Sequence, residues 1–185
     1  GLDLSSHMLD VCRSGREDEP AEVQARTRLV QEDMRDFDLG KQFQLITTPF
    51  RPFQHLLTVE DQLRCLGAIR RHLAPDGVFI LDIFNPSLSG ITADNLGQEV
   101  GAEPEFTTPE GIKVRRFNQT NARDHFRQIL DVELIYYLTY PDGREERGVH
   151  AFQMRYLFRY ESEHLLARAG FQVTDLYANF SREPY

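Results

Sequence analysis

Residues 43–86 read FQLITTPFRPFQHLLTVEDQLRCLGAIRRHLAPDGVFILDIFNP, and this stretch decides the fold. Phe43–Thr48 is a short apolar, β-rich run that predicts a strand. Thr58 and Asp61 have the spacing of a capping box, which predicts the start of a helix. Apolar residues then recur at helical intervals and give that helix one buried face: Leu63, Leu66, Ile69 and Leu73.

A second strand should follow this helix. Pro75–Gly77 has turn chemistry through which a helix does not continue. Val78–Phe84 is nearly continuously apolar, as in a strand that is covered on both faces. The order strand, helix, strand predicts a right-handed βαβ unit in a parallel sheet. Because ligands bind at the carboxyl ends of such strands, we look for a site near Thr48–Phe50, His55 and Asn85–Pro86.

Composition limits the classes of partner. The chain of 185 residues suits one domain, with room for an insertion. The net charge is −8 and the basic residues are scattered, which argues against nucleic acid as the main partner. No apolar run approaches the roughly 20 residues needed to cross a membrane. Cys12 and Cys65 lack zinc-like spacing, so we expect buried free thiols in a reducing cytoplasm.

The first part of the chain predicts short elements. Leu2–Leu4 should be a strand end, and Ser5 or Ser6 should cap a helix that stops at Gly15. Arg16–Arg26 is charged and contains a proline, so it predicts a solvated loop or a frayed helix. Arg28–Gln31 should be another short strand.

The second half changes character after Pro86. Ser87–Pro109 predicts a long loop or lid. From Ile112 to Phe158 the hydrophobic period is two, which predicts an antiparallel hairpin around Pro141–Gly143 with a third strand at Lys113–Thr120. The chain should close with a helix, ended by Gly170, and a strand; these ranges are Glu161–Ala169 and Phe171–Ala178. The organisation expected is a core of residues 1–86 and 160–185 with an insertion of residues 87–159.

Two acids stand out because each follows a predicted strand. Asp3 and Asp33 should lie at one edge of the sheet on neighbouring strands. A carboxylate there can accept both hydroxyls of a ribose, and a second one can accept an adenine amino group. Taken singly, each acid is also explained as a cap of the helix or turn that follows it.

The segments GLDLSSHML, LVQEDMRDF, FQLITTPFRPFQHL, LRCLGAIRRHLAPDGVFILDIFNP and LLARAGF occur in this order. Together they resemble the class I S-adenosylmethionine-dependent methyltransferases, and the later hairpin resembles the insertion of small-molecule members. The resemblance implies an α/β protein with a Rossmann-like, doubly wound, mostly parallel sheet and an inserted antiparallel hairpin or three-stranded sheet. It also implies S-adenosylmethionine as cofactor.

The resemblance assigns cofactor contacts to particular residues. Asp3 would bind the ribose diol, and Leu4 and Met8 would pack around the adenine. Asp33 would accept the adenine amino group, and the Met34 N–H would bind a ring nitrogen. Thr48 and Pro49 would line the methionine part of the cofactor. Leu4 and Met8 are equally explained as ordinary core residues.

A catalytic residue and an acceptor pocket are predicted with open alternatives. His55 could take a proton from an attacking amine or hydroxyl, or it could only order its loop. Phe50, Tyr136 and Tyr156 could wall the acceptor pocket. An aromatic stripe of this kind is also explained as the apolar face of a sheet, or as a surface covered by a second subunit.

One family feature is missing. No Gly-x-Gly occurs in the sequence, and the first, central strand with its glycine-rich loop is not seen. That loop lets the backbone approach the cofactor without a Cβ clash. We therefore expect a segment upstream of this sequence, or weak cofactor binding by this chain alone.

The predicted function is methyl transfer from S-adenosylmethionine to a nitrogen or oxygen of a small molecule by direct displacement. The expected protein is cytoplasmic, needs no metal, binds neither nucleic acid nor membrane, and could form a homodimer. One alternative is an NAD(P)-dependent oxidoreductase, because an acid after a strand also suits a dinucleotide. The other is a noncatalytic methyltransferase-like module that dimerises.

Overall fold

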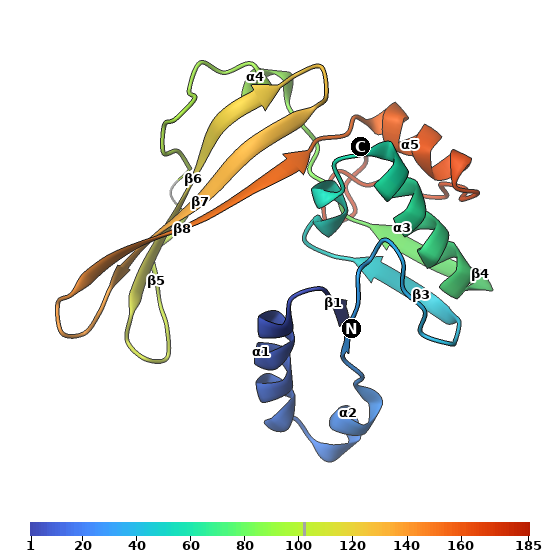
Figure 1. The fold of residues 1–185 in the computed structure, drawn as a ribbon, viewed down its shortest axis with the longest axis horizontal. Helices are drawn as coiled ribbons and strands as arrows, with labels where there is room; N and C mark the ends of the chain where they lie inside the picture. Colours follow the sequence, from blue (N-terminus) through green and yellow to red (C-terminus); the bar gives the residue numbers. More distant parts are fainter. Residues whose placement is uncertain (102) are drawn as a thin grey trace. The chain divides into compact units, whose positions relative to one another are not determined.

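The computed structural model describes residues 1–101 and 103–185. The chain divides into two compact units. The first unit contains residues 1–47, 58–80 and 163–185, and the second contains residues 48–57 and 81–162. Each unit has buried residues of its own, and Figure 1 shows the elements of both in sequence colours.

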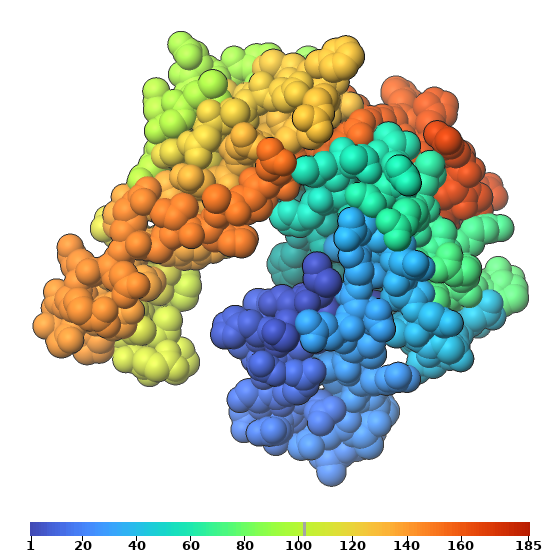
Figure 2. All heavy atoms as spheres, viewed as in Figure 1, coloured from blue at the N-terminus to red at the C-terminus, as the bar shows by residue number. Residues whose placement is uncertain are grey.

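A parallel strand pair opens the first unit. Strand β1 (Leu2–Asp3) pairs with β2 (Val30–Gln31), with Leu2 opposite Val30 and Asp3 opposite Gln31. Helix α1 (Ser6–Glu17) follows β1, and the Ser5 side chain caps it by accepting the Met8 N–H. Its side chains lie largely at the surface, seen in dark blue in Figure 2, apart from the buried Leu9.

The predicted end of this helix at Gly15 is wrong, because α1 runs on to Glu17. A glycine inside a helix costs only about 1 kcal/mol, so it does not by itself stop one. The break comes at Pro20, since a proline disfavours helical backbone in the residue before it. Helix α2 (Ala21–Arg26) begins directly after Pro20, so the segment predicted as a loop contains a short helix.

The decisive stretch forms the expected strand, helix and strand. Strand β3 (Phe43–Thr48) pairs with β4 (Leu73–Leu81), and helix α3 (Val59–His72) connects them. The Thr58 hydroxyl accepts the Asp61 N–H at 3.1 Å, which confirms the predicted cap. The buried face of α3 comprises Gln62, Cys65, Leu66, Ala68, Ile69 and His72.

Strand β4 starts earlier and ends earlier than predicted. Pro75–Gly77, predicted as a turn, lies inside the strand. A Cβ at Gly77 would lie 2.9 Å from the Leu73 Cγ and 2.9 Å from the Phe43 carbonyl oxygen. Gly77 thus permits a close approach of β4 to the start of β3 that a side chain would block.

Helix α5 (Arg159–Arg168) ends as predicted at Gly170, which has a φ of 83°. The Phe171 N–H donates to Leu166 O and the Gly170 N–H donates to Ala167 O, each at 2.9 Å, as in a Schellman motif. The strand predicted for Phe171–Ala178 is not formed. The Phe171 ring instead packs on Phe79, with centroids 5.6 Å apart.

The second unit is built on an antiparallel sheet in the order β5-β6-β7-β8. Its strands are β5 (Phe106–Thr107), β6 (Lys113–Asp124), β7 (Ile129–Thr139) and β8 (Glu145–Arg155). The turn at Pro141–Gly143 is confirmed, and Gly143 has a φ of 85°. Strand β8 ends at Arg155 rather than at Phe158. The predicted lid contains a short helix, α4 (Leu88–Ile91), besides β5.

The predicted fold class is confirmed: helices combine with a parallel strand pair and a separate antiparallel sheet. In the described residues, β1–β2 and β3–β4 are two separate two-stranded sheets. Both cysteines are free, but Cys12 is exposed and only Cys65 is buried. Within the described residues, no helix has the length and apolar character that crossing a membrane requires.

Candidate functional site

Asp3 and Asp33 lie at the carboxyl edge of the β1–β2 pair. The parallel register sets Asp3 opposite Gln31, so Asp33 lies two residues beyond the end of the neighbouring strand. The Asp3 Oδ1 accepts the Ser5 N–H at 2.8 Å, which uses one of its two carboxylate oxygens in the turn before α1. The expected pair of acids therefore shares one edge of one sheet.

Asp33 is held by Arg35. The guanidinium Nε lies 3.0 Å from both carboxylate oxygens, and Nη2 lies 2.5 Å from Oδ2. The Arg35 backbone N–H also donates to Oδ1, at 2.9 Å. The hydrogen bonds from the Arg35 side chain and, to a smaller extent, the one from its backbone N–H lower the pKa of Asp33. This carboxylate is therefore ionised throughout the neutral range.

Two apolar side chains near this edge are exposed. Leu4 is 66% exposed and Met8 is 52% exposed. The alternative that they are ordinary core residues does not hold in this structure. Met34 is half-buried, directly after Asp33.

The loop after β3 has an unusual backbone. Phe50 and Arg51 have φ values of 63° and 67°, a region that residues with a side chain seldom adopt. Strain of this kind is often found at functional sites. Just before it, the Thr48 Oγ1 is buried and has no hydrogen-bond partner in the described residues, whereas Pro49 is exposed.

Two residues that the sequence reading missed hold this loop in place. Asp82 directly follows β4, and its Oδ2 accepts the Phe50 N–H at 3.2 Å. Gln54 is fully buried, and its Oε1 accepts the Phe84 N–H at 2.5 Å while its Nε2 donates to Arg155 O at 3.0 Å. Asp82 was missed because the strand was predicted to run to Phe84, whereas β4 ends at Leu81 and leaves Asp82 just beyond it.

His55 ends the short 3-10 helix η1 (Pro52–His55) and is exposed. Its Nδ1 lies 3.3 Å from Gln153 O on β8. Its ring meets Phe152 edge-on, with centroids 5.1 Å apart. With the hydrogen on Nδ1 donated to Gln153, Nε2 is left as the proton-accepting atom.

The three predicted acceptor contacts lie in different surroundings. Phe50 is 91% exposed, and Tyr136 is half-buried on β7 opposite Gly148. Tyr156 is only 2% exposed and packs in a cluster with Ile91 and Leu130. Burial raises the pKa of Tyr156, as expected for a phenol inside an apolar core. The burial of Tyr156 therefore fits the alternative, that this residue belongs to the apolar core at the sheet, better than a place in the wall of an acceptor pocket.

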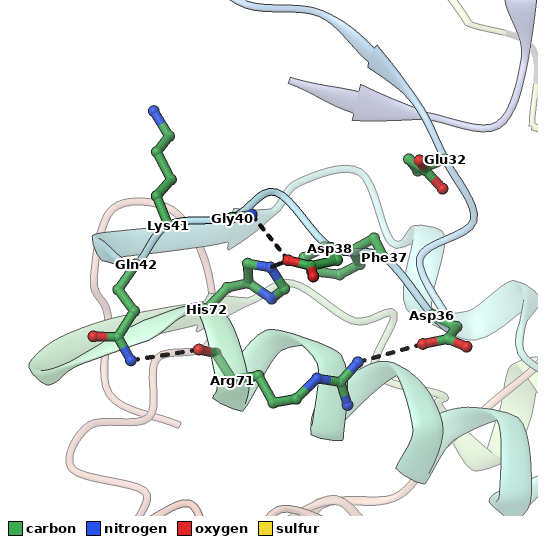
Figure 3. A pocket seen from close by; sticks show the side chains of 9 residues that line it. All are labelled: Glu32, Asp36, Phe37, Asp38, Gly40, Lys41, Gln42, Arg71 and His72. Atoms are coloured by element: carbon green, nitrogen blue, oxygen red, sulfur yellow. Dashed lines mark hydrogen bonds and ion pairs between the residues drawn. The ribbon is translucent and has the colours of Figure 1, made fainter.

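A cavity of about 700 Å³ lies among other residues of the first unit, and none of the predicted site residues lines it. It is bordered by Glu32, Asp36, Phe37, Asp38, Gly40, Lys41, Gln42, Arg71 and His72 (Figure 3). Figure 3 shows Asp38 beside His72 and Asp36 beside Arg71, whereas Lys41 and Glu32 stand apart from these pairs. The residues between Asp38 and Gln42 precede β3, so this part of the cavity lies before that strand and not at its carboxyl end.

The predicted site residues fall in both compact units. Asp3, Leu4, Met8, Asp33 and Met34 belong to the first unit. Thr48, Pro49, Phe50 and His55 belong to the second. In the part of the chain that the structure describes, no three His, Cys, Asp or Glu side chains are grouped as a metal site requires.

Residues 1–77 match the family described as "Methyltransferase domain". This range includes Asp3, Asp33 and His55. The match to this methyltransferase domain covers less than half of the chain. The predicted resemblance to class I S-adenosylmethionine-dependent methyltransferases is confirmed. The match covers the segments of the resemblance up to Gly77, and LLARAGF lies outside it.

Curated relatives are similar over the same region. The chain is 33% identical over 82 residues to dTDP-3-amino-3,4,6-trideoxy-alpha-D-glucopyranose N,N-dimethyltransferase of Streptomyces venezuelae. It is also 33% identical over 82 residues to dTDP-4-amino-2,3,4,6-tetradeoxy-D-glucose N,N-dimethyltransferase of Saccharopolyspora spinosa. The match covers 44% of this chain and 31% of the Streptomyces protein, so it spans under a third of that relative.

Solved structures extend the similarity in fold to nearly the whole chain. DesVI of Streptomyces venezuelae is 22% identical with a TM-score of 0.78, covering 99% of this chain and 70% of that one. CalS10, an amino pentose methyltransferase from Micromonospora echinaspora solved with bound S-adenosylmethionine, is 22% identical with a TM-score of 0.71, covering 99% and 70%. At these identities the similarity establishes the Rossmann-like methyltransferase fold.

Proposed function

We propose that this protein is an S-adenosylmethionine-dependent methyltransferase that transfers a methyl group to the nitrogen of a small molecule. The observation that carries the proposal is the acidic edge of β1–β2. Asp3 and Asp33 lie there at neighbouring strand ends, inside the residues that match the methyltransferase domain family.

The residues present suit this cofactor. Asp3 keeps a carboxylate oxygen beyond the one used by Ser5, and a carboxylate at a strand end can bind a ribose diol. Leu4 and Met8 offer exposed apolar surface for the adenine, and Asp33 with the Met34 N–H offers its polar contacts. The buried Thr48 hydroxyl, which has no partner among the described residues, can hydrogen-bond the amino-acid end of the cofactor.

The chemistry that the cofactor supplies when bound is an activated methyl group on a sulfonium. The protein's part is then chiefly to position the acceptor in line with that group. The His55 Nε2 can take the proton that an attacking amine must lose, while Nδ1 and the contact with Phe152 hold the ring in place. No covalent bond between protein and acceptor is needed.

An aminated sugar linked to a nucleotide is the acceptor class we propose. The support is that the curated relatives are N,N-dimethyltransferases named for dTDP-linked amino sugars. The proposal includes a cytoplasmic location, because Cys12 and Cys65 are both free thiols, as in proteins of a reducing compartment. It also includes a homodimer, which a measurement of molar mass in solution tests.

The test is transfer of a labelled methyl group. The full chain is incubated with methyl-labelled S-adenosylmethionine and a set of dTDP-linked amino sugars, with the corresponding hydroxy sugars as controls. We expect label on the amino sugars only. No transfer to any of them, together with no binding of S-adenosylhomocysteine, would contradict the proposed function, and saturable binding of NAD would favour the oxidoreductase.

A further inference from the structure

Arg35 surrounds the Asp33 carboxylate with donors. Three N–H groups of this one residue point at it: the backbone N–H at 2.9 Å from Oδ1, Nε at 3.0 Å from both oxygens, and Nη2 at 2.5 Å from Oδ2. An ionised carboxylate offers roughly four acceptor positions. Arg35 therefore fixes the orientation of the group and leaves it room for one further donor.

Arg35 is itself held from the other side. Its Nη1 lies 3.6 Å from Oδ2 of Asp61, in the first turn of α3, and that side chain is only 25% exposed. Arg64 binds the same Asp61 at 3.6 Å and extends the network to Asp36 at 4.0 Å. The alternating charges join the loop after β2 to helix α3, so the Asp33 carboxylate does not rotate freely as a surface acid does.

We propose that Arg35 is a positioning residue that makes the site selective for a 6-aminopurine, by holding the Asp33 carboxylate ready to accept one N–H from the purine amino group. This inference rests on the proposed function and adds to it. A carboxylate held in this way accepts a hydrogen bond from the amino group of adenine. It repels the carbonyl oxygen that hypoxanthine carries at the same position, because both groups are acceptors.

Lysine and glutamine do not replace this arginine. Lysine keeps the charge but lacks the planar fork that binds both carboxylate oxygens. Glutamine removes the charge and the fork together. Arg26 is a matched control, because it forms an exposed ion pair with Glu22 on α2 and takes no part in the network around Asp33.

The experiment compares the affinities of the full chain for S-adenosylhomocysteine and for S-inosylhomocysteine by calorimetry. A hydrogen bond to a charged group gives about tenfold or more in affinity, so the wild type should prefer the adenosyl ligand by at least that factor. Arg35→Gln should lower this ratio several-fold, Arg35→Lys should lower it less, and Arg26→Gln should leave it unchanged. Circular dichroism checks that each variant folds.

Three outcomes separate the inference from the proposed function. A reduced ratio in Arg35→Gln, or in Arg35→Lys if the glutamine variant does not fold, supports the inference. A normal ratio in these variants overturns the inference and leaves the proposed function standing, because the adenosyl ligand still binds. No binding of either ligand by the wild type overturns both.

Discussion

Gln54 accepts the Phe84 N–H through its side-chain Oε1 at 2.5 Å, although 30 residues separate them in the sequence. Its Nε2 donates at the same time to Arg155 O, 101 residues away, and the side chain is fully buried. One amide thus ties η1, which carries His55, to the residues after β4 and to the end of β8. The position of His55 depends on this buried contact.

Replacing Gln54 should therefore destabilise the protein. Gln54→Ala leaves the partly buried Phe84 N–H and Arg155 C=O without these partners, and each such loss costs about 1–3 kcal/mol. We expect the free energy of unfolding in urea to fall by about 2–4 kcal/mol. The exposed Gln98 is the control, since Gln98→Ala should change it by less than about 0.5 kcal/mol. Equal effects of the two substitutions would show that the contact is unimportant.

Asp3→Asn should weaken cofactor binding with little change in the fold. Asparagine keeps an oxygen that can accept the Ser5 N–H but removes the charge that suits a ribose diol. We expect the affinity for S-adenosylhomocysteine to drop by about tenfold or more, because a charged hydrogen bond is lost. Asp10→Asn, on the exposed side of α1, should leave it unchanged. If calorimetry finds the same affinity for Asp3→Asn and wild type, Asp3 is not part of the site.

His55→Gln should slow methyl transfer without changing cofactor affinity. Removing a general base typically lowers kcat by about 10²-fold or more. His150 offers a matched control, because its ring also contacts Phe152, with centroids 5.4 Å apart, and it has no assigned role. Steady-state kinetics on an amino-sugar acceptor should show a loss for His55→Gln and a near-normal kcat for His150→Gln. Similar rates for both variants would mean that His55 only orders its loop.

The two cysteines should differ sharply in reactivity. Burial, together with the nearby charge of Asp33, raises the pKa of Cys65 to about 12, whereas Cys12 is exposed. The thiolate is the reactive form, so Cys65 in the folded protein should resist iodoacetamide at pH about 8. Mass spectrometry of peptides should find label on Cys12 alone, and on both residues in urea. Rapid labelling of Cys65 in the folded protein would show that its surroundings open readily.

Local signals in the sequence predicted much of the fold. The Thr58 cap, the Pro141–Gly143 turn and the helix end at Gly170 each depend on residues within a few positions of one another. The strand predicted at Phe171–Ala178 does not form. A strand needs a neighbouring strand for its backbone hydrogen bonds, and the hydrophobic pattern of one segment does not show whether such a neighbour exists. The predicted helix end at Gly15 was wrong because a single glycine costs too little free energy to break a helix.

The candidate site could be predicted only in part, for a similar reason. The acids Asp3 and Asp33 were found because each follows a strand, and parallel strands bring their carboxyl ends to one edge. Gln54 was missed because its partners lie far along the chain, at Phe84 and Arg155. Arg35 was missed although it is two residues from Asp33, because sequence does not show which of several acids an arginine binds.

Calorimetric titration of the full chain with S-adenosylhomocysteine, and separately with NAD, tests the central claim most directly. If the edge formed by Asp3 and Asp33 receives the adenosine part of the cofactor, S-adenosylhomocysteine binds saturably and NAD does not. Binding of NAD alone, or of neither compound, would contradict it.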